Sequence, residues 1–531
     1  MKKKLLSILM ILCLVFVFTA CGDKETAEAE PNEAEPNEAE PTETEPTDVF
    51  VAAISGEVLT LDPQVAAGTP AEIARMEMFE SLIVQEDDGS FSPCLAESWE
   101  VSEDGTTYTF HIRQGVKFHD GSELTADDVV ATFQRLLDRA YGSARVTDVP
   151  NLIAVEKVDD YTVNLINDGP VGNFLNQIAY GTGFIMSSEV IEEYKENVGT
   201  YAVGTGPYKL VDFESSEYVL MEANEDYWGE VPKIKQLKIV CVTEASTRVN
   251  MILTGEAQYA QDIPPQDVVS VENSDVATIR YDESNRVFQV GFNLNVEPLN
   301  NKLVRQAMNY AIDKDAIITG VLGGAGSKTN NVVATNVFGY IDGQYTYDLD
   351  KAKELMKEAG YEDGFEMTIW TPNGRYYKDK DVVLAVAEQL KKINITLDVV
   401  VHDWATYLSI VKTAPDETEC SMYIFGWECY TREAGYTINT LFTKKQWAPD
   451  GWNTMYYEND ELEAVNMKIM HETDQTVREG IMQEALTIID EDAVWIPIFS
   501  YDQISAVAKG LEEVKILPTQ LPVFKDAYWA D

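Results

Sequence analysis

The segment GWECY at residues 426–430 brings an indole ring, a carboxylate and a phenol close together in the chain. An indole ring can stack on a sugar or another ring, and its N–H can donate one hydrogen bond. A carboxylate can pair with a cationic group that has been removed from water. The segment therefore predicts a small-molecule contact surface formed by Trp427, Glu428 and Tyr430. Burial of Trp427 for packing alone is the alternative interpretation.

Arg375 lies in the segment PNGRYY at residues 372–377. An arginine side chain is a planar fork that matches a carboxylate with two parallel hydrogen bonds, so Arg375 is a candidate anchor for an acidic group of a ligand. A structural ion pair within an acidic protein is the alternative. Trp404 and Tyr436 are further candidates, because aromatic rings commonly line small-molecule pockets.

The sequence offers little support for catalysis or for a metal. The histidines are His111, His119, His402 and His471, and no pair has the HExxH spacing or a neighbouring CxxC that indicates zinc. We find no GxSxG elbow, no Walker A loop and no GxGxxG after a predicted strand. We therefore predict a protein that is not an enzyme and has no cofactor and no metal. A hydrolase with two converging carboxylates is the alternative from another class.

The composition restricts the partners. The formal net charge is −50, and phosphate binding needs a basic face, so nucleic acid is not expected as a partner. Acids spread over a large surface chiefly favour solubility. Outside the first 21 residues the cysteines are Cys94, Cys241, Cys420 and Cys429, and their spacing does not settle a disulfide pairing.

The first 48 residues have two different compositions. Three lysines precede an apolar run that ends at Thr19-Ala20-Cys21-Gly22, which is the pattern of an export signal over residues 1–20. The Cys that follows looks like the lipid-modified residue of a bacterial lipobox, with ordinary cleavage or an uncleaved anchor as alternatives. Residues 21–48 contain the motif PNEAE twice, and their composition predicts an acidic, extended tether. We expect an exported protein that is held on the outer face of the cell membrane, or in the periplasm, by a lipid on Cys21.

Strand and helix signals alternate through the remaining chain and predict a mixed α/β fold. Residues 107–112 alternate like a strand, and Thr125 with the acids after it predicts a helix N-terminus. Asp348 predicts the cap of another helix. Residues 382–390 have helical periodicity and residues 395–400 alternate as a strand.

Several of these segments occur together in a recognisable order. The block LAESWEVSEDGTTYTFHIRQGVKFHDGSELTADDVVATFQRLL at residues 95–137 is followed by GTGPYKL at 204–210 and NEDYWG at 224–229. The order closely resembles the family 5 extracellular solute-binding proteins, which are the oligopeptide and dipeptide receptors of ABC importers. The resemblance extends from about Phe50 to about Phe524.

The resemblance implies a two-lobed, hinged α/β receptor of the large periplasmic-binding-protein type with an extra subdomain. It predicts lobe I from residues 49–84, 204–292 and 498–531, the extra subdomain from 85–203, and lobe II from 293–497. A ligand would lie between the lobes, and closure over it would create the shape that the permease recognises. We expect a monomer that works with an ABC permease and its ATPase subunits.

One position departs from the family pattern. In the peptide-binding relatives, an Asp three residues after the Trp of the Gly-Trp pair holds the α-ammonium group of the peptide. Tyr430 stands at that position here, and Glu428 could replace the Asp from two residues away. We therefore predict a receptor for oligopeptides or dipeptides, with a non-peptide solute such as a glycan fragment or a metal chelate as the alternative.

Overall fold

The computed structural model of the chain describes residues 49–65, 68–415 and 417–530. The predicted export signal, Cys21 and the tether lie outside these residues. A search of the described residues found no helix with the length and apolar character needed to cross a bilayer.

One large mixed sheet is the main framework of the protein. Its strands are β1 (Val49–Ile54), β8 (Tyr208–Glu214), β9 (Tyr218–Ala223), β10 (Gln236–Cys241), β11 (Tyr259–Ala260), β12 (Ala277–Phe292), β13 (Gly326–Lys328), β14 (Phe365–Pro372), β15 (Ile395–His402), β16 (Met422–Glu428) and β17 (Trp495–Ala508). The strand order is β15-β14-β16-β12-β17-β11-β1-β10-β9-β8, with β13 paired to β17. We call the part from β11 to β8 lobe I, and the part formed by β15, β14 and β16 with their helices lobe II.

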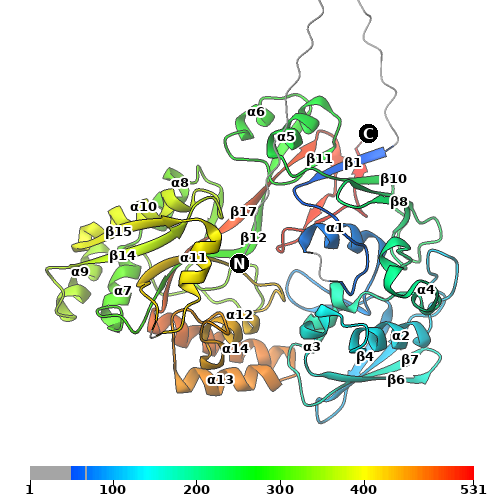
Figure 1. The fold of residues 1–531 in the computed structure, drawn as a ribbon, viewed down its shortest axis with the longest axis horizontal. Helices are drawn as coiled ribbons and strands as arrows, with labels where there is room; N and C mark the ends of the chain where they lie inside the picture. Colours follow the sequence, from blue (N-terminus) through cyan, green and yellow to red (C-terminus); the bar gives the residue numbers. More distant parts are fainter. Residues whose placement is uncertain (1–48, 66–67, 416, 531) are drawn as a thin grey trace, which may run out of the picture. The chain divides into compact units, whose positions relative to one another are not determined.

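The two longest strands, β12 and β17, run antiparallel to one another and connect the lobes (Figure 1). At one end Ala277 and Ala506 belong to an apolar core of lobe I, and at the other end Val290 and Ile496 belong to the core of lobe II. The ladder is irregular between Glu283 and Val287, about halfway along β12. The lobes therefore share a two-stranded connection whose regular pairing is interrupted where the lobes meet.

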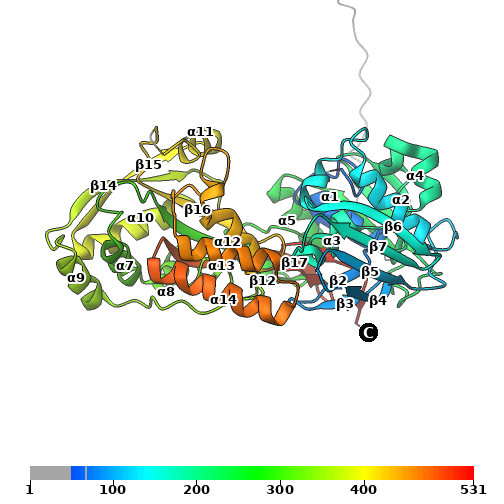
Figure 2. The ribbon, with the colours of Figure 1, turned by 90° about the horizontal axis from the view of Figure 1, so that it is seen from below.

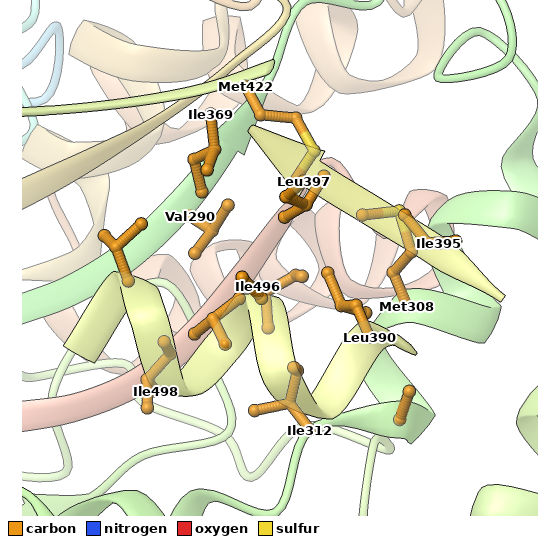
Figure 3. Close-up of a cluster of buried hydrophobic side chains, with 14 of the residues drawn as sticks. Val290, Met308, Ile312, Ile369, Leu390, Ile395, Leu397, Met422, Ile496 and Ile498 are labelled. Atoms are coloured by element: carbon orange, nitrogen blue, oxygen red, sulfur yellow. The ribbon is translucent and has the colours of Figure 1, made fainter. Parts of the chain in front are cut away.

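Lobe II surrounds its part of the sheet with helices. They are α7 (Lys302–Ala311), α8 (Lys314–Gly320), α9 (Leu349–Glu358), α10 (Asp379–Leu390), α11 (Trp404–Val411), α12 (Ala434–Phe442), α13 (Asp460–His471) and α14 (Gln475–Asp492). Figure 3 shows apolar side chains from five strands meeting Met308 of α7 and Leu390 of α10 in one core. The predicted cap is confirmed, because the Asp348 side chain accepts a hydrogen bond from the backbone at the start of α9.

Lobe I packs α1 (Thr69–Met78) against its strands, and α5 (Ala245–Thr254) and α6 (Val268–Glu272) form a smaller core with β11. Two glycines of the GTGPY segment lie against the last turn of α1. A Cβ atom at Gly204 or Gly206 would overlap the backbone of Met78. Neither glycine has a positive φ angle, so close backbone approach rather than a left-handed turn explains why glycine occurs at both positions.

The block at residues 95–137 lies in a separate antiparallel sheet. Its strands are β4 (Ala96–Val101), β5 (Thr107–Ile112), β6 (Leu152–Asp159) and β7 (Thr162–Asn167), in the order β4-β5-β7-β6. The helix α2 (Ala126–Leu137) packs on this sheet, and Thr125 and Asp128 form a reciprocal capping box at its start. The predicted strand and helix start are confirmed. The domain limits given above remain a prediction.

Candidate functional site

The GWECY segment forms the end of a buried strand. All seven residues of β16 are buried, and Trp427 and Glu428 lie opposite Val287 and Arg286 of β12. The chain then leaves the sheet through the loop 429–433 and begins α12 at Ala434. Because neighbouring strand residues point to opposite faces, Trp427 and Glu428 have different surroundings.

Trp427 is packed among other aromatic rings. Its ring stacks on Tyr436 with centroids 6.0 Å apart and lies 5.7 Å from the ring of Trp452. The side chain is only 9% exposed and belongs to a lobe II core, and its Nε1 has no hydrogen-bond partner among the described residues. Packing against other side chains of lobe II therefore covers most of the Trp427 side chain, as the alternative interpretation predicts. A contact between Trp427 and a ligand remains a prediction.

Glu428 forms an ion pair with Arg286, a residue that sequence analysis did not single out. Burial raises the pKa of the Glu428 carboxyl, and the guanidinium groups of Arg286 and Arg375 oppose that rise. A carboxylate that already has a cationic partner is a poor anchor for an additional ammonium group. The pairing depends on the register between β12 and β16, and no local sequence pattern indicates it.

Tyr430 lies in the loop after β16, beyond the regular strand, and is 63% exposed. Its ring meets Tyr436 edge to face, with centroids 6.2 Å apart. The pKa of Tyr430 is raised, mainly by partial desolvation of its hydroxyl and to a smaller extent by the nearby Glu428 carboxylate. The position where the peptide-binding relatives have an acid therefore carries an exposed phenol beside a carboxylate that is already paired.

Arg375 and Trp404 lie together at the ends of neighbouring strands. The Arg375 guanidinium carbon lies 4.8 Å from the centroid of the Trp404 ring, a distance typical of a cation–π contact. The backbone N–H groups of Arg375 and Tyr376 donate to the Asp379 carboxylate at 3.0 and 3.2 Å, which fixes the loop before α10. Among the described residues, no carboxylate lies within ion-pairing distance of the Arg375 side chain. The structural ion pair considered above is therefore not found within the described part of the chain.

A cavity of about 470 Å³ has walls from both lobes. Its lining residues are Asp262, Ile263, Pro264, Pro265, Arg286, Ala325, Arg375, Tyr376, Tyr377, Tyr501, Asp502, Gln503, Ile504 and Gln520. Arg375 is the one predicted site residue in this wall. The wall carries two guanidinium groups, Arg286 and Arg375, and two carboxyl groups, Asp262 and Asp502. Among the described residues Arg286 is paired with Glu428 and Arg375 has no ion-pair partner, so Arg375 can accept a ligand carboxylate.

A second cavity of about 210 Å³ contains Tyr430 in its wall. It is lined by Met76, Phe79, Glu80, Ser81, Val84, Gln85, Glu86, Cys94, Asn176, Ala179, Tyr180, Phe184, Pro207, Tyr227, Tyr430, Arg432, Lys515, Leu517, Thr519, Val523 and Lys525. The Glu80 carboxylate accepts hydrogen bonds from Thr205 at 2.8 Å, Tyr227 at 2.7 Å and Trp228 at 2.8 Å. These contacts explain why the GTGPY and NEDYWG segments occur together. The wall combines apolar side chains with two carboxyl groups and three cationic groups, namely Glu80, Glu86, Arg432, Lys515 and Lys525.

The structure thus places the predicted residues in one region without giving them equal roles. Arg375 lines the first cavity and Tyr430 the second, while neither cavity is lined by the other predicted residues, Trp427, Glu428, Trp404 and Tyr436. The described residues include no group of three or more His, Cys, Asp or Glu side chains placed to hold a metal ion. Cys94, Cys241, Cys420 and Cys429 are free thiols. The arrangement can enclose and bind a small solute.

The comparison with known families agrees with this geometry. Residues 90–449 match the family model described as bacterial extracellular solute-binding proteins, family 5 Middle. The chain belongs to family 5. The recognition from sequence is confirmed, and the match spans the subdomain, the hinge strand β12 and most of lobe II.

Relatives of this family 5 protein match it over nearly their whole length. The glutathione-binding protein GsiB of Salmonella typhi is 30% identical over 480 residues, which are 90% of this chain and 94% of the relative. The structure of HbpA2 from Haemophilus parasuis superposes with a TM-score of 0.82 at 27% identity, and covers 91% of this chain and 99% of its own. The periplasmic binding protein DppA from Helicobacter pylori, in complex with the peptide STSA, gives 0.70 at 26% identity, with 91% and 98% covered. The two-lobed α/β fold class is confirmed.

Proposed function

We propose that this family 5 protein is the substrate-binding component of an ABC importer, and that it captures small peptides or peptide-like solutes bearing a carboxylate. Its family membership supports the general role, and relatives named for binding glutathione and a tetrapeptide support the ligand class. The protein would deliver its ligand unchanged to a permease with ATPase subunits, as a monomer without a cofactor or a reaction of its own.

The observation that carries the ligand class is the Arg375 guanidinium. Glu428 is already paired with Arg286, and among the described residues no carboxylate forms an ion pair with Arg375, although Asp262 and Asp502 also line this cavity. Stacking on Trp404 holds the guanidinium in place, which lowers the conformational entropy lost when it binds a ligand. A carboxylate fits this fork with two hydrogen bonds.

The amino end of a peptide would be held differently from the pattern of the relatives. Tyr430 supplies no negative charge, and the Glu428 carboxylate is buried beside Arg286. A phenol instead offers a hydrogen bond and a ring face. This observation also favours the second candidate, an acidic solute that is not a peptide, such as a glycan fragment or a metal chelate.

We expect the Arg375→Ala variant to bind Ser-Thr-Ser-Ala about 10- to 100-fold more weakly than the wild type, because a hydrogen-bonded charge contributes about 1.5 to 3 kcal/mol. Isothermal titration calorimetry with this peptide and with glutathione measures the effect. C-terminal amidation of the peptide should weaken binding to the wild type by a similar factor and have little further effect on the variant. N-terminal acetylation should change affinity less than about threefold.

Arg139→Ala is the matched control, because Arg139 is exposed in the subdomain and away from both cavities. Equal affinity of wild type and Arg375→Ala for the free acid would reject the carboxylate anchor. Binding of neither probe by the wild type, together with a non-peptide solute in the mass spectrum of the purified protein, would support the second candidate instead.

We also propose that the mature protein is a lipoprotein anchored through Cys21, on the basis of the export signal and the acidic segment that follows it. Expressed in a bacterial host, the wild type should incorporate a palmitate analogue and partition into detergent, because the acyl chains bind the membrane. Cys21→Ser should lose the label and the partitioning, while Cys241→Ser should keep both. A labelled Cys21→Ser protein would contradict the anchor.

A further inference from the structure

The side chain of Arg432 extends from lobe II to the opposite side of the cleft. Its Nη1 donates to the carbonyl oxygen of Gln85 at 3.3 Å, and its Nη2 donates to the carbonyl of Glu86 at 3.1 Å and to Asp87 Oδ1 at 3.0 Å. Gln85 ends β2 (Ile83–Gln85), and Asp87 lies in the turn that follows. One guanidinium thus spans from the loop 429–433 to three consecutive residues of the other half of the molecule.

The residue before Arg432 strengthens the same contact. The carbonyl of Thr431 accepts a hydrogen bond from Gln85 Nε2 at 3.2 Å and another from Asn176 Nδ2 at 3.1 Å. Gln85 therefore forms two hydrogen bonds with the loop 429–433, because its backbone carbonyl accepts from Arg432 and its side-chain amide donates to Thr431. Reciprocal bonds of this kind fix the position of the loop more firmly than one ion pair would.

The backbone at Arg432 is in an uncommon conformation. Its φ angle is 56°, and non-glycine residues in this region cost of order 1 kcal/mol and persist where their surroundings fix them. On the lobe II side, the carbonyl of Arg432 accepts a hydrogen bond from Phe338 N at 3.0 Å, and its N–H donates to Cys429 O at 3.0 Å. The side chain is fixed by contacts with the other half of the molecule, and the residue as a whole is only 8% exposed. Strain held between two lobes is typical of a functional contact.

Asp87 joins this contact to the wall of the second cavity. Lys515 Nζ lies 3.1 Å from Asp87 Oδ2, on the carboxylate that Arg432 also contacts. Partial burial opposes ionisation of Asp87, but Lys515 and Arg432 together hold its pKa below the usual value. Lys515, Arg432 and Tyr430 all line the second cavity. We call Arg432, Asp87 and Lys515 the latch, and a solute in this cavity would meet two of its members, Arg432 and Lys515.

Other hydrogen bonds between the halves are accepted by backbone carbonyl groups. Gly172 N donates to Met470 O at 2.8 Å, and the side chain of Gln475 donates to Gly89 O. Figures 1 and 2 show the corresponding approach of α13 to α3 (Phe174–Ile178). Among these contacts the latch is the charged one, and it lies beside the cavity.

We propose that Arg432 is the positioning residue that holds the lobes together over a bound solute, and that breaking the latch sets the rate at which the solute leaves. The effect on release rests on the proposed function, because it needs a bound solute. The contact between Arg432 and residues 85–87 is independent of the proposed function, because it forms without a solute. Tyr430 and Arg432 occupy one short loop, so a ligand that orders this loop also strengthens the contact of Arg432 with residues 85–87.

Stopped-flow tryptophan fluorescence with Ser-Thr-Ser-Ala tests the proposal. We expect Arg432→Ala to raise the dissociation rate constant by about tenfold or more and to change the association rate constant less than about threefold, because truncating a buried charged partner acts mainly on dissociation. Arg432→Lys should lie between, since it keeps the charge but loses the fork. Asp87→Asn should raise dissociation by about two- to fivefold, because the two backbone carbonyl bonds remain.

Arg139→Ala again serves as the control and should leave both rate constants unchanged. Asp87 is exposed, so its variant provides a test even where Arg432→Ala folds poorly. Unchanged dissociation in both Asp87→Asn and Arg432→Lys would overturn the proposal. A slower association with unchanged dissociation would also overturn it and would make Arg432 a residue that shapes the pocket.

Hydrogen exchange of the ligand-free protein tests the latch without a solute. It therefore shows whether a negative result arises because the latch proposal is wrong or because the proposed ligand class is wrong. We expect Arg432→Ala to speed amide exchange at least about tenfold in the segments around residues 85–89 and 429–433, and to leave the β14 and β15 amides unchanged. If no peptide binds to the wild type but this local change occurs, the proposed ligand class fails and the closing contact stands. Equal exchange in variant and wild type would reject the latch irrespective of ligand.

Discussion

Replacing Glu433 with Ala lowers the free energy of unfolding by about 3 to 5 kcal/mol, which is the expected cost of removing one partner from a buried ion pair. The Glu433 and Arg478 side chains are 1% and 3% exposed, and Arg478 Nη2 donates to Glu433 Oε1 at 2.5 Å. Without Glu433, the Arg478 charge stays buried with its Nε still bonded to Ile469 O at 2.9 Å. The lobe II transition in urea, followed by tryptophan fluorescence, measures the change.

Two controls show whether the buried charge is responsible. The double variant Glu433→Leu/Arg478→Met should lose much less stability than the sum of the single variants, because no unpaired charge remains. Lys444→Ala removes an exposed partner of Glu458 in the same lobe and should cost less than about 1 kcal/mol. Additive losses in the double variant would show that packing, rather than charge pairing, makes Glu433 important.

The second large effect concerns Glu77, which is fully buried in α1 and accepts a hydrogen bond from Phe524 N at 2.6 Å. Burial raises the pKa of its carboxyl to about 8 in the folded protein, from an ordinary value of 4.5. The folded state therefore binds the proton more tightly, and stability is lost as the pH rises between these two values. The loss approaches about 1.4 kcal/mol per pH unit and about 5 kcal/mol in total.

Glu77→Gln keeps an acceptor for Phe524 N and removes the charge. We expect the variant to be more stable than the wild type by an amount that grows from pH 5 to pH 8 and then levels off. Chemical denaturation at each pH gives the difference, with Glu222→Gln on the exposed side of β9 as a control that shows no such trend. A difference that does not depend on pH would mean that the pKa of Glu77 is the same in the folded and unfolded states, which would contradict the prediction.

Local patterns in the sequence were enough to predict much of the fold. Thr125 and Asp348 cap helices where predicted because an N-cap is decided by a side chain and the backbone two or three residues later. The strand at residues 107–112 follows from alternation alone. The order of the family segments predicted the two lobes, which periodicity alone would not have shown.

The site was less predictable because its contacts join distant parts of the chain. Arg286 reaches Glu428 through strand register, and Arg432 reaches Asp87 from the opposite half of the protein. Neither ion pair could be predicted from the spacing of its residues in the sequence. Trp427 and Tyr436 were both predicted as pocket residues, and the structure stacks the two rings on one another, with Trp452 covering more of the Trp427 surface.

The position of β17 in the sheet has a consequence for how the protein is made. This strand lies between β12 and β11, yet it is the last long strand in the chain, ending at Ala508. Neither half of the sheet can be completed while residues 495–508 are still inside the ribosome or a secretion channel. Contacts between residues so far apart in sequence form slowly. The nascent chain therefore stays incompletely folded until residues 495–508 are free to pair with β12 and β11.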